Sequence, residues 1–399
     1  MERYSEYKDS GVEWLGEIPR HWGLIKSKYL WKESFNISEQ GNEELLSVSQ
    51  YDGITPAKGD TRSEALDGYK IVKKDDLVIN IMLAWMGGLG ISAYNGIVSP
   101  AYCVYKLNYN YNPRFFHYLY KTPLYLSEFA KHSTGVIPSR WRMYTDDFGQ
   151  VLSLIPPIEE QNAIVAYLDK VTSKIDAAIV QQQKMIELLN ERKQIIINNA
   201  VTKGLDPTAK MKPSGIPWLG NIPAHWEVRK LKQIVRLQSG ETINSEMFTE
   251  SGYPVFGGNG FRGYTDTYNH DGNYILIGRQ GALCGNINYA HGQFFATEHA
   301  VVVYPLKNED IIWLGELLRS SNLNQYSQSA AQPGLSVSVI GNICYPYPPD
   351  KEKKKISTYL QSVLPKIENG INICNDRIDL LQERKQIIIN EVVTGKVKI

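Results

Sequence analysis

The chain has 399 residues and a formal net charge of +1, with 43 Lys and Arg against 42 Asp and Glu. This length exceeds what one ordinary hydrophobic core serves, so we expect two globular domains. No run of 18 apolar residues occurs and the N-terminus lacks signal-peptide character, which predicts a cytosolic protein with no membrane segment. The cysteines show neither a disulfide framework nor zinc-ligand spacing: they are Cys103, Cys284, Cys344 and Cys374.

A turn-rich segment with two tryptophans opens each half of the chain. Residues 10–22 read SGVEWLGEIPRHW, and residues 214–226 read SGIPWLGNIPAHW. Their Gly and Pro positions interrupt helix and strand patterns. The Trp and His pairs would contact DNA in one interpretation. We favour a hydrophobic clip that fixes a domain onto a helix, because paired tryptophans in irregular segments are seldom stable in water.

Two dissimilar segments follow the clips, with the same predicted order of strands, helix, strand and long helix. In the first we expect strands within 70–80 and over 97–105, and a helix over 114–130. In the second we expect strands over 274–277 and 300–304, and a helix over 311–319. One scaffold would therefore carry two different surfaces.

A long helix closes each half. The octapeptide ERKQIIIN occurs at residues 191–198 and again at 383–390, an offset of 192 residues. Around it, apolar residues recur at steps of three and four, which predicts a narrow seam suited to a partner helix. These residues are Ile164, Leu168, Val171, Ile175, Ala178, Met185, Leu189 and Ile196, then Ile356, Leu360, Val363, Ile367, Cys374, Leu381 and Ile388.

The two seams are alike, so we expect them to pack on each other as antiparallel helices, with the two domains at opposite ends. Roughly 40 helical residues would span about 60 Å. Proline pairs at 156–157 and 348–349 precede the helices, and Gly204 and Gly395 lie where they should end. Pro365 stands where the first helix has Ser173, which predicts a break or kink near 364 and near 172.

This layout resembles the specificity subunit of type I restriction–modification systems. The resemblance covers essentially the whole chain and rests on PPIEEQ at 156–161, the ERKQIII helix ends and the WLGxIPxHW segments. It implies an α+β fold: two globular α/β target-recognition domains joined by two long antiparallel coiled-coil helices, duplicated about a pseudo-twofold axis. The expected segments are target-recognition domains at 1–156 and 205–348, and helical spacers at 157–204 and 349–399. The second helix begins with PDKE instead of PIEE, so equivalent partner contacts at both helix starts are in question.

The resemblance also implies partners. Double-stranded DNA with a bipartite target would bind the two domains, the coiled coil would set the spacer, and two modification (methyltransferase) subunits and restriction subunits would bind the frame. S-adenosylmethionine, ATP and Mg would belong to those partner subunits, and the chain itself would need no cofactor. Accordingly, the sequence has no phosphate-binding GxxxxGK[ST] loop and no [ND]PP[YF] methyltransferase motif.

Candidate base-reading residues occur in both domains, since Arg suits guanine and Asn or Gln suits adenine. In the first domain, a loop of cations and aromatics contains Arg140, Trp141, Arg142 and Tyr144; a surface cation–π cluster is the alternative interpretation. Met82 and Trp85 suggest either a groove-inserting wedge or, as we favour, core packing.

In the second domain, a glycine-rich stretch carries Asn259, Arg262 and Tyr264, and its backbone would approach phosphates or form a plain flexible turn. Arg279 and Gln280 directly follow a predicted strand. For the neighbouring Glu298–His299 pair, we favour a structural hydrogen bond over a metal site.

Two other functions remain open. Residues 1–156 carry 17 Lys and Arg against 18 Asp and Glu, and residues 205–348 carry 10 against 11. DNA-binding domains are usually basic. A coiled-coil adaptor whose domains bind proteins would therefore explain the near-neutral charge of both domains better than a DNA-binding subunit does. It does not explain two unlike surfaces on duplicated frames. A fused restriction or methylation enzyme is the second alternative, and the missing motifs disfavour it.

Overall fold

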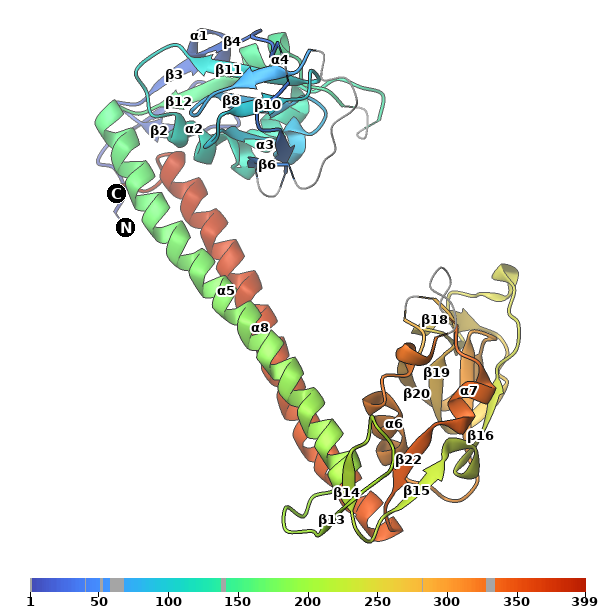
Figure 1. Cartoon of the computed structure of the whole chain (residues 1–399). Coiled ribbons are helices and arrows are strands. Elements are labelled where there is room, and N and C mark those ends of the chain that lie inside the picture. Colours follow the sequence, from blue (N-terminus) through green and yellow to red (C-terminus); the bar gives the residue numbers. More distant parts are fainter. Residues whose placement is uncertain are drawn as a thin grey trace. The chain divides into compact units, whose positions relative to one another are not determined.

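The computed structural model describes residues 2–39, 41–50, 53–57, 68–137, 141–281, 283–327 and 334–399. The chain divides into two compact units: unit 1 comprises Met1–Gln182 and Asp376–Ile399, and unit 2 comprises Gln183–Asn375. Each unit therefore contains part of both long helices, α5 (Ile158–Lys203) and α8 (Asp350–Val393) (Figure 1). The domain boundaries given from the sequence stay a prediction, because this division follows contacts and splits both helices.

Unit 1 is built on a four-stranded antiparallel sheet with smaller strand pairs around it. The sheet order is β4–β11–β8–β9, where the strands are Trp31–Glu33, Tyr102–Leu107, Leu77–Asn80 and Leu89–Ile91. The two-stranded pairs are β1 (Tyr7–Asp9) with β2 (Glu17–Pro19), β3 (Gly23–Lys26) with β12 (Leu152–Ile155), β5 (Leu46–Ser49) with β6 (Gly53–Pro56), and β7 (Lys70–Val72) with β10 (Gly96–Val98).

Two expectations for unit 1 are wrong in detail. The single helix expected over 114–130 is two helices, α2 (Pro113–Tyr120) and α3 (Pro123–Lys131). Pro123 lacks an N–H with which to continue α2, and the Thr122 hydroxyl caps α3 by accepting from the Tyr125 N–H. The single strand expected over 97–105 is β10 and β11, separated by a turn at 99–101. Among the residues that the structure describes, the remaining helices of this unit are α1 (Ser27–Leu30), η1 (Ala84–Met86) and α4 (Thr145–Gln150).

Unit 2 is built on a six-stranded sheet of order β16–β21–β19–β20–β17–β18. Its neighbours pair antiparallel except β17 with β20, which are parallel. The strands are β16 (Val235–Ser239), β17 (Tyr253–Gly257), β18 (Gly260–Thr265), β19 (His270–Gly278), β20 (Ile287–Ala296) and β21 (Ala300–Pro305). The smaller pairs are β13 (Met211–Pro213) with β14 (Asn221–Pro223) and β15 (Glu227–Lys230) with β22 (Cys344–Tyr347).

The frame that holds each sheet is the same in both units. The β1–β2 pair corresponds to β13–β14, the β3–β12 pair to β15–β22, and α2 to α6 (Ile311–Ser320). A short helix then precedes the last strand in both, α4 in unit 1 and α7 (Val337–Asn342) in unit 2. The 3-10 turns of unit 2 are η3 (Leu231–Gln233), η4 (Ser245–Met247) and η5 (Leu323–Tyr326).

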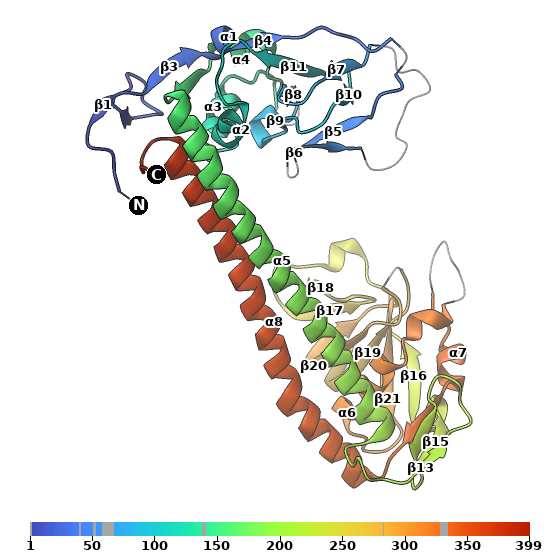
Figure 2. The same cartoon turned by 60° about the vertical axis from the view of Figure 1, so that its left-hand side comes forward.

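Within each unit, α5 and α8 run side by side in opposite directions (Figure 2). In unit 1 the first half of α5 meets the end of α8: Ile164 and Leu168 share a buried cluster with Val392, and Lys385 Nζ lies 2.7 Å from Asp176 Oδ1. In unit 2 the end of α5 meets the start of α8, with Val201 and Leu360 in one cluster and Lys193 Nζ 2.7 Å from Glu368 Oε2. The antiparallel prediction is thus confirmed.

Two predictions about the helices are wrong. Neither helix breaks near 172 or 364: α5 is continuous, and Pro365 lies inside α8. Pro365 is exposed, so water can hydrate the carbonyl that loses its partner. Met185, expected in the seam, is 49% exposed, and the neighbouring Ile186 is the more buried. The predicted helix ends are confirmed, since Gly204 and Gly395 have φ of +77° and +73° just beyond α5 and α8.

Candidate nucleic-acid interface

In unit 1, a contact between two tryptophans joins the two segments that the sequence marked as candidates. The rings of Trp85 and Trp141 meet edge-on with centroids 5.3 Å apart, and the Met143 N–H donates to the Ile81 carbonyl at 2.9 Å. No sequence pattern indicates that these two segments meet. The indole Nε1 of Trp85 is buried and has no hydrogen-bond partner among the described residues, so Trp85 belongs to the packing of this region.

Two other predicted residues of this loop, Arg142 and Tyr144, are exposed. The backbone of Arg142 is held by two hydrogen bonds with Thr134, of 3.0 and 2.9 Å, and its side chain is exposed. Tyr144 is 49% exposed at the start of α4. Arg140 lies outside the described residues. Met82 and Met86, next to Trp85, are 42% and 40% exposed, so this surface combines a cation with apolar side chains.

In unit 2, a cavity of about 600 Å³ brings together three of the predicted residues. Its lining comprises Gly258, Asn259, Phe261, Arg262, Gln280, Gly281, His299 and Gly334. The lining polar groups are amides, a guanidinium and an imidazole, which are the groups that form hydrogen bonds with base edges. Phe261 and His299 were not predicted as readers. Nothing in the sequence places His299 beside the glycine-rich stretch.

The glycine-rich stretch forms a β-hairpin of β17 and β18, and its turn lies at 258–259. The approach of its backbone to phosphates stays a prediction. Gly260 has φ of +92°, which favours glycine. A Cβ on Gly258 would lie 3.1 Å from the His299 carbonyl oxygen, a tight contact, so the close approach of the backbone favours glycine there too. Tyr264 is exposed on β18 and packs edge-on against Phe261 at 5.1 Å.

Arg279 adjoins this cavity but does not line it. Its guanidinium Nη1 donates to the Ser239 hydroxyl at 3.1 Å, and its backbone N–H donates to the His299 carbonyl at 2.8 Å. Nearby, His299 Nε2 lies 3.2 Å from Glu298 Oε1, in agreement with a structural contact. Across the described residues, no group of three or more potential ligands could hold a metal ion.

The clip segments fix each sheet to the first turn of its long helix. Trp22 and Trp226 are fully buried, and their indole Nε1 groups donate to Glu160 Oε2 at 3.1 Å and to Glu352 Oε2 at 2.9 Å. His21 and His225 contact the same two carboxylates at 2.8 and 2.6 Å. The hydrophobic-clip interpretation is therefore correct. The second helix start, despite its different sequence, keeps the glutamate that holds the tryptophan.

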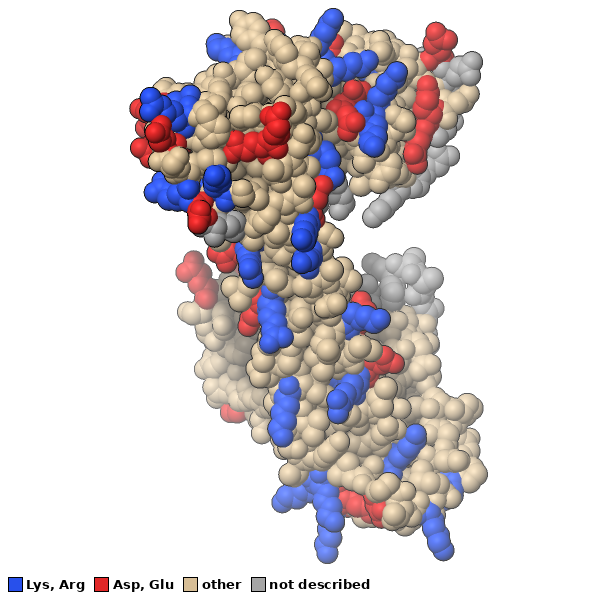
Figure 3. All heavy atoms as spheres, turned by 90° about the vertical axis from the view of Figure 1, so that its left-hand side faces the viewer, with Lys and Arg blue, Asp and Glu red and all other residues tan. Residues whose placement is uncertain are grey.

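The first turns of α8 also present an exposed cationic surface. Lys351, Lys354 and Lys355 line a shallow depression of about 530 Å³ together with the exposed ring of Tyr359. Figure 3 shows Lys and Arg side chains projecting at intervals along the long helices. Positive charge is thus present locally in a chain that is nearly neutral overall. No helix of the described chain is both long and apolar enough to cross a membrane.

Comparisons with known proteins agree with this architecture. The family described as "Type I restriction modification DNA specificity domain" matches residues 223–373. The specificity subunit of the type I restriction enzyme EcoprrI of Escherichia coli is 40% identical over 149 residues, which are 36% of each chain. The MjaVIII specificity subunit of Methanocaldococcus jannaschii is 28% identical over 275 residues, covering 61% of this chain and 62% of the relative. These matches thus span from about a third to under two thirds of the curated relatives.

A solved structure shares the fold along nearly the whole chain. It was described in work on complex assembly and conformational transition of the type I R-M system. It superposes with a TM-score of 0.73 at 14% identity, covering 95% of this chain and 99% of that chain. The chain is thus similar to specificity subunits of type I restriction–modification systems in sequence, and it shares the fold of the solved type I structure along nearly its whole length.

Proposed function

We propose that the chain is the DNA sequence-recognition subunit of a type I restriction–modification complex, in which each domain reads one half of a bipartite target. The observation that carries this proposal is the gathering of Asn259, Arg262 and Gln280 around one cavity of unit 2. Asn259 and Arg262 lie on the β17–β18 hairpin, and Gln280 comes from a different segment that follows β19. Amide and guanidinium groups gathered at one surface match the donor and acceptor pattern of base edges.

The chemistry of these side chains suits base edges. An arginine donates two hydrogen bonds to guanine O6 and N7, and an asparagine or glutamine pairs with adenine N6 and N7. Each such pair contributes about 1–3 kcal/mol of discrimination. In unit 1, Arg142 and Tyr144 would contact DNA beside the exposed methionines, with a different set of bases because the two surfaces share no side-chain pattern.

The duplicated frame supports a bipartite target. Two readers held by one frame contact two half-sites at a fixed separation, and α5 and α8 are each continuous through both units. We expect the insertion of one heptad into each helix, about 10 Å of helix, to lengthen the spacer by about three base pairs and to leave both half-sites unchanged. Altered half-sites with an unaltered spacer would contradict this part of the proposal.

Catalysis would belong to other subunits in this proposal. Two modification subunits with S-adenosylmethionine, and restriction subunits with ATP and Mg, would bind the frame of this non-catalytic chain. The cationic start of α8 offers one surface for such a subunit, because Lys351, Lys354 and Lys355 are exposed. In such a complex, the partner subunits would supply part of the positive charge that attracts DNA phosphates, so this chain need not supply all of it.

The test is a map of methylated DNA sites produced with the partner subunits present. We expect Arg262→Ala and Gln280→Ala to relax the bases accepted in one half-site and to leave the other half-site unchanged. The matched control is Lys232→Ala, an exposed cation in η3 of the same unit. Sites that do not change with any cavity substitution, in a complex that still forms, would favour the protein-binding adaptor.

A further inference from the structure

The two long helices carry different side chains at one buried position of their first turn. Gln161 and Lys353 are separated by the repeat offset of 192 residues, and they are 0% and 1% exposed. Their backbone N–H groups donate to corresponding carbonyls, those of Pro157 at 2.9 Å and Pro349 at 3.1 Å. The same place in the fold therefore holds a neutral amide in unit 1 and a cation in unit 2.

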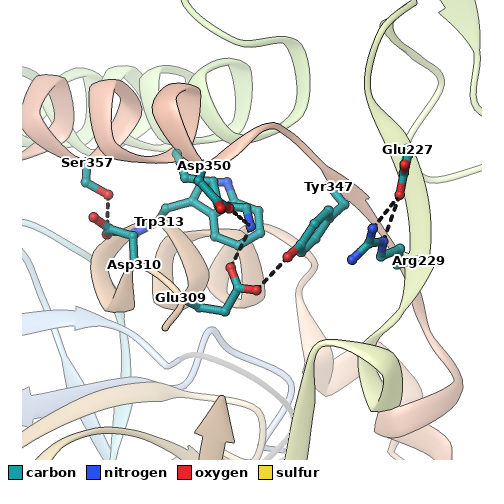
Figure 4. A network of polar contacts seen from close by, with 9 residues as sticks. Glu227, Arg229, Glu309, Asp310, Trp313, Tyr347, Asp350 and Ser357 are labelled. Carbon is teal, nitrogen blue, oxygen red and sulfur yellow. Dashed lines mark hydrogen bonds and ion pairs between the residues drawn. The ribbon is translucent and has the colours of Figure 1, made fainter. Parts of the chain in front are cut away.

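Lys353 is surrounded by acidic and aromatic groups of unit 2. Figure 4 shows four of these groups, Glu309, Trp313, Tyr347 and Asp350. Its Nζ lies 2.6 Å from Glu309 Oε2 and 2.9 Å from Asp350 Oδ1, and 3.6 Å from the centroid of the Tyr347 ring. The Tyr347 hydroxyl donates to the other oxygen of Glu309 at 2.6 Å. The side chains of Lys353 and Glu309 are 2% and 3% exposed, so the two charges are paired away from water.

The pairing keeps Lys353 charged. Burial by itself lowers the pKa of Lys353, but the hydrogen bonds with Glu309, Tyr347 and Asp350 outweigh it, so the pKa lies above its ordinary value. Asp350 is the weaker partner because its side chain is 91% exposed. The buried carboxylate of Glu309 is therefore the group that neutralises Lys353.

The hydrogen-bond partners of the Gln161 side chain among the described residues are neutral. Its Nε2 donates to the Pro156 carbonyl at 2.8 Å, and its Oε1 accepts from the Asn112 N–H at 2.9 Å. These bonds satisfy both ends of the amide, as a buried polar group requires. Neither of these two partners is a carboxylate.

The difference extends to the sheet-bearing domains. Asn112 caps α2 by accepting from Arg114 N, and Asp310 caps α6 by accepting from Ile312 N, so these two residues correspond. The residue before each cap is Tyr111 in unit 1 and Glu309 in unit 2. Tyr111 packs against the apolar cluster of unit 1. The carboxylate thus comes from the recognition domain, and the cation comes from the helix.

A mismatch would bury an unpaired charge. The second recognition domain placed on the first helix would present Glu309 to the neutral Gln161. The first recognition domain placed on α8 would present Tyr111 to Lys353. Removing one partner of a buried ion pair costs several kcal/mol, because the remaining charge is desolvated without compensation.

We propose that positions 161 and 353 form a docking code that decides which recognition domain each helix start accepts. A domain with a carboxylate before the cap of its helix requires lysine on the long helix, and a domain with a neutral residue there requires glutamine. Moving a recognition domain from one helix start to the other would then also require changing the residue at position 161 or 353 of the helix that receives it. The inference concerns how the domains dock, and it holds whatever bases they read.

The decisive experiment uses one substitution in two full-length chains. In a chimera, residues 227–347 replace residues 23–155, so that the second recognition domain precedes both helices. We expect Gln161→Lys to raise the folding equilibrium constant of the grafted unit by about 100-fold or more, as for restoring a buried charge partner. In the natural chain, we expect the same substitution to lower the folding equilibrium constant of unit 1 by a similar factor. Hydrogen exchange of the amides of each unit measures both, and the same sign in both chains would overturn the proposal.

A second experiment stays within the natural chain and decides the matter if the chimera does not fold. Lys353→Gln and Glu309→Gln each leave one buried charge, so each should lower the folding equilibrium constant of unit 2 by about 100-fold or more. The double variant should recover most of that loss, because no charge is left unpaired. Lys354→Gln is the matched control, since it removes an exposed positive charge one residue away. Additive losses in the double variant would show that the pair carries no docking code.

Discussion

Trp226 and Glu352 are joined by a hydrogen bond of 2.9 Å from the indole Nε1 to the carboxylate Oε2, and this bond ties a clip segment to the first turn of a long helix. Trp22 and Glu160 form the same pair in the other unit. The two tryptophans are completely buried, so no water can replace the carboxylates as acceptors. The repeated sequence thus encodes a repeated joint between domain and helix.

We expect Glu352→Ala to lower the free energy of unfolding of unit 2 by about 1–3 kcal/mol, because it leaves a buried N–H without an acceptor. Glu352→Gln keeps an acceptor oxygen and should cost less. Urea denaturation followed by Trp fluorescence measures both, and Lys351→Ala, an exposed neighbour, is the control. Equal losses for the alanine and glutamine variants would show that the hydrogen bond is not the source of the effect.

The second prediction concerns pH. Burial, assisted by the charges of Lys121 and Arg114, lowers the pKa of His117 from 6.5 to about 4. Its Nδ1 accepts a hydrogen bond from the Ile91 N–H at 3.2 Å, which requires that nitrogen to be unprotonated. The unfolded chain therefore binds a proton at a higher pH than the folded chain, and stability is lost as the pH falls from about 6.5 to about 4, by up to about 3 kcal/mol.

Denaturation of the whole chain across that pH range measures this loss, and His117→Gln is the comparison. Glutamine can still accept from Ile91 but does not titrate, so the variant should lose less stability on acidification. An unchanged pH profile in His117→Gln would assign the acid sensitivity to other groups.

The third prediction exchanges residues between the two helices. Pro365 lies within α8, where it removes one backbone hydrogen bond, while its counterpart Ser173 lies within α5. Both side chains are exposed. We expect Pro365→Ser to stabilise unit 2, and Ser173→Pro to destabilise unit 1 by about 3 kcal/mol or more. Hydrogen exchange along both helices measures the two effects. A loss of stability in Pro365→Ser would show that the proline is required by the packing of α8.

The fourth prediction separates phosphate contact from base contact at Arg142. Its exposed side chain extends from a backbone bridge with Thr134, beside an apolar surface. If Arg142 contacts phosphate, Arg142→Ala should weaken DNA binding of the assembled complex for every sequence and reduce the salt slope of log K by about 1. Titrations at several salt concentrations, on specific and unrelated DNA, measure this. Relaxed specificity in one half-site with an unchanged slope would instead identify a base contact.

The sequence alone determined the duplicated frame. The clips, the seams and the terminal glycines are local patterns, since their periodicity and turn residues dictate a helix, a stop or a turn wherever they occur. The antiparallel pairing followed from two like seams in one chain. Two predictions about the helices were wrong, and packing decides both of them. Met185 is exposed while the neighbouring Ile186 is more buried, and α8 continues through Pro365.

Long-range packing determines which of the candidate residues meet. The sheet of unit 2 brings His299 and Gln280 to Asn259 and Arg262, although its order β16–β21–β19–β20–β17–β18 is not that of the chain. Trp85 and Trp141 likewise meet through long-range packing. The buried Lys353 reads as one more surface lysine in the sequence, and Glu309 reads as a loop carboxylate. Strand order and burial depend on contacts between distant residues, which periodicity cannot encode, so the cavity and the buried ion pair emerge only when the chain has folded.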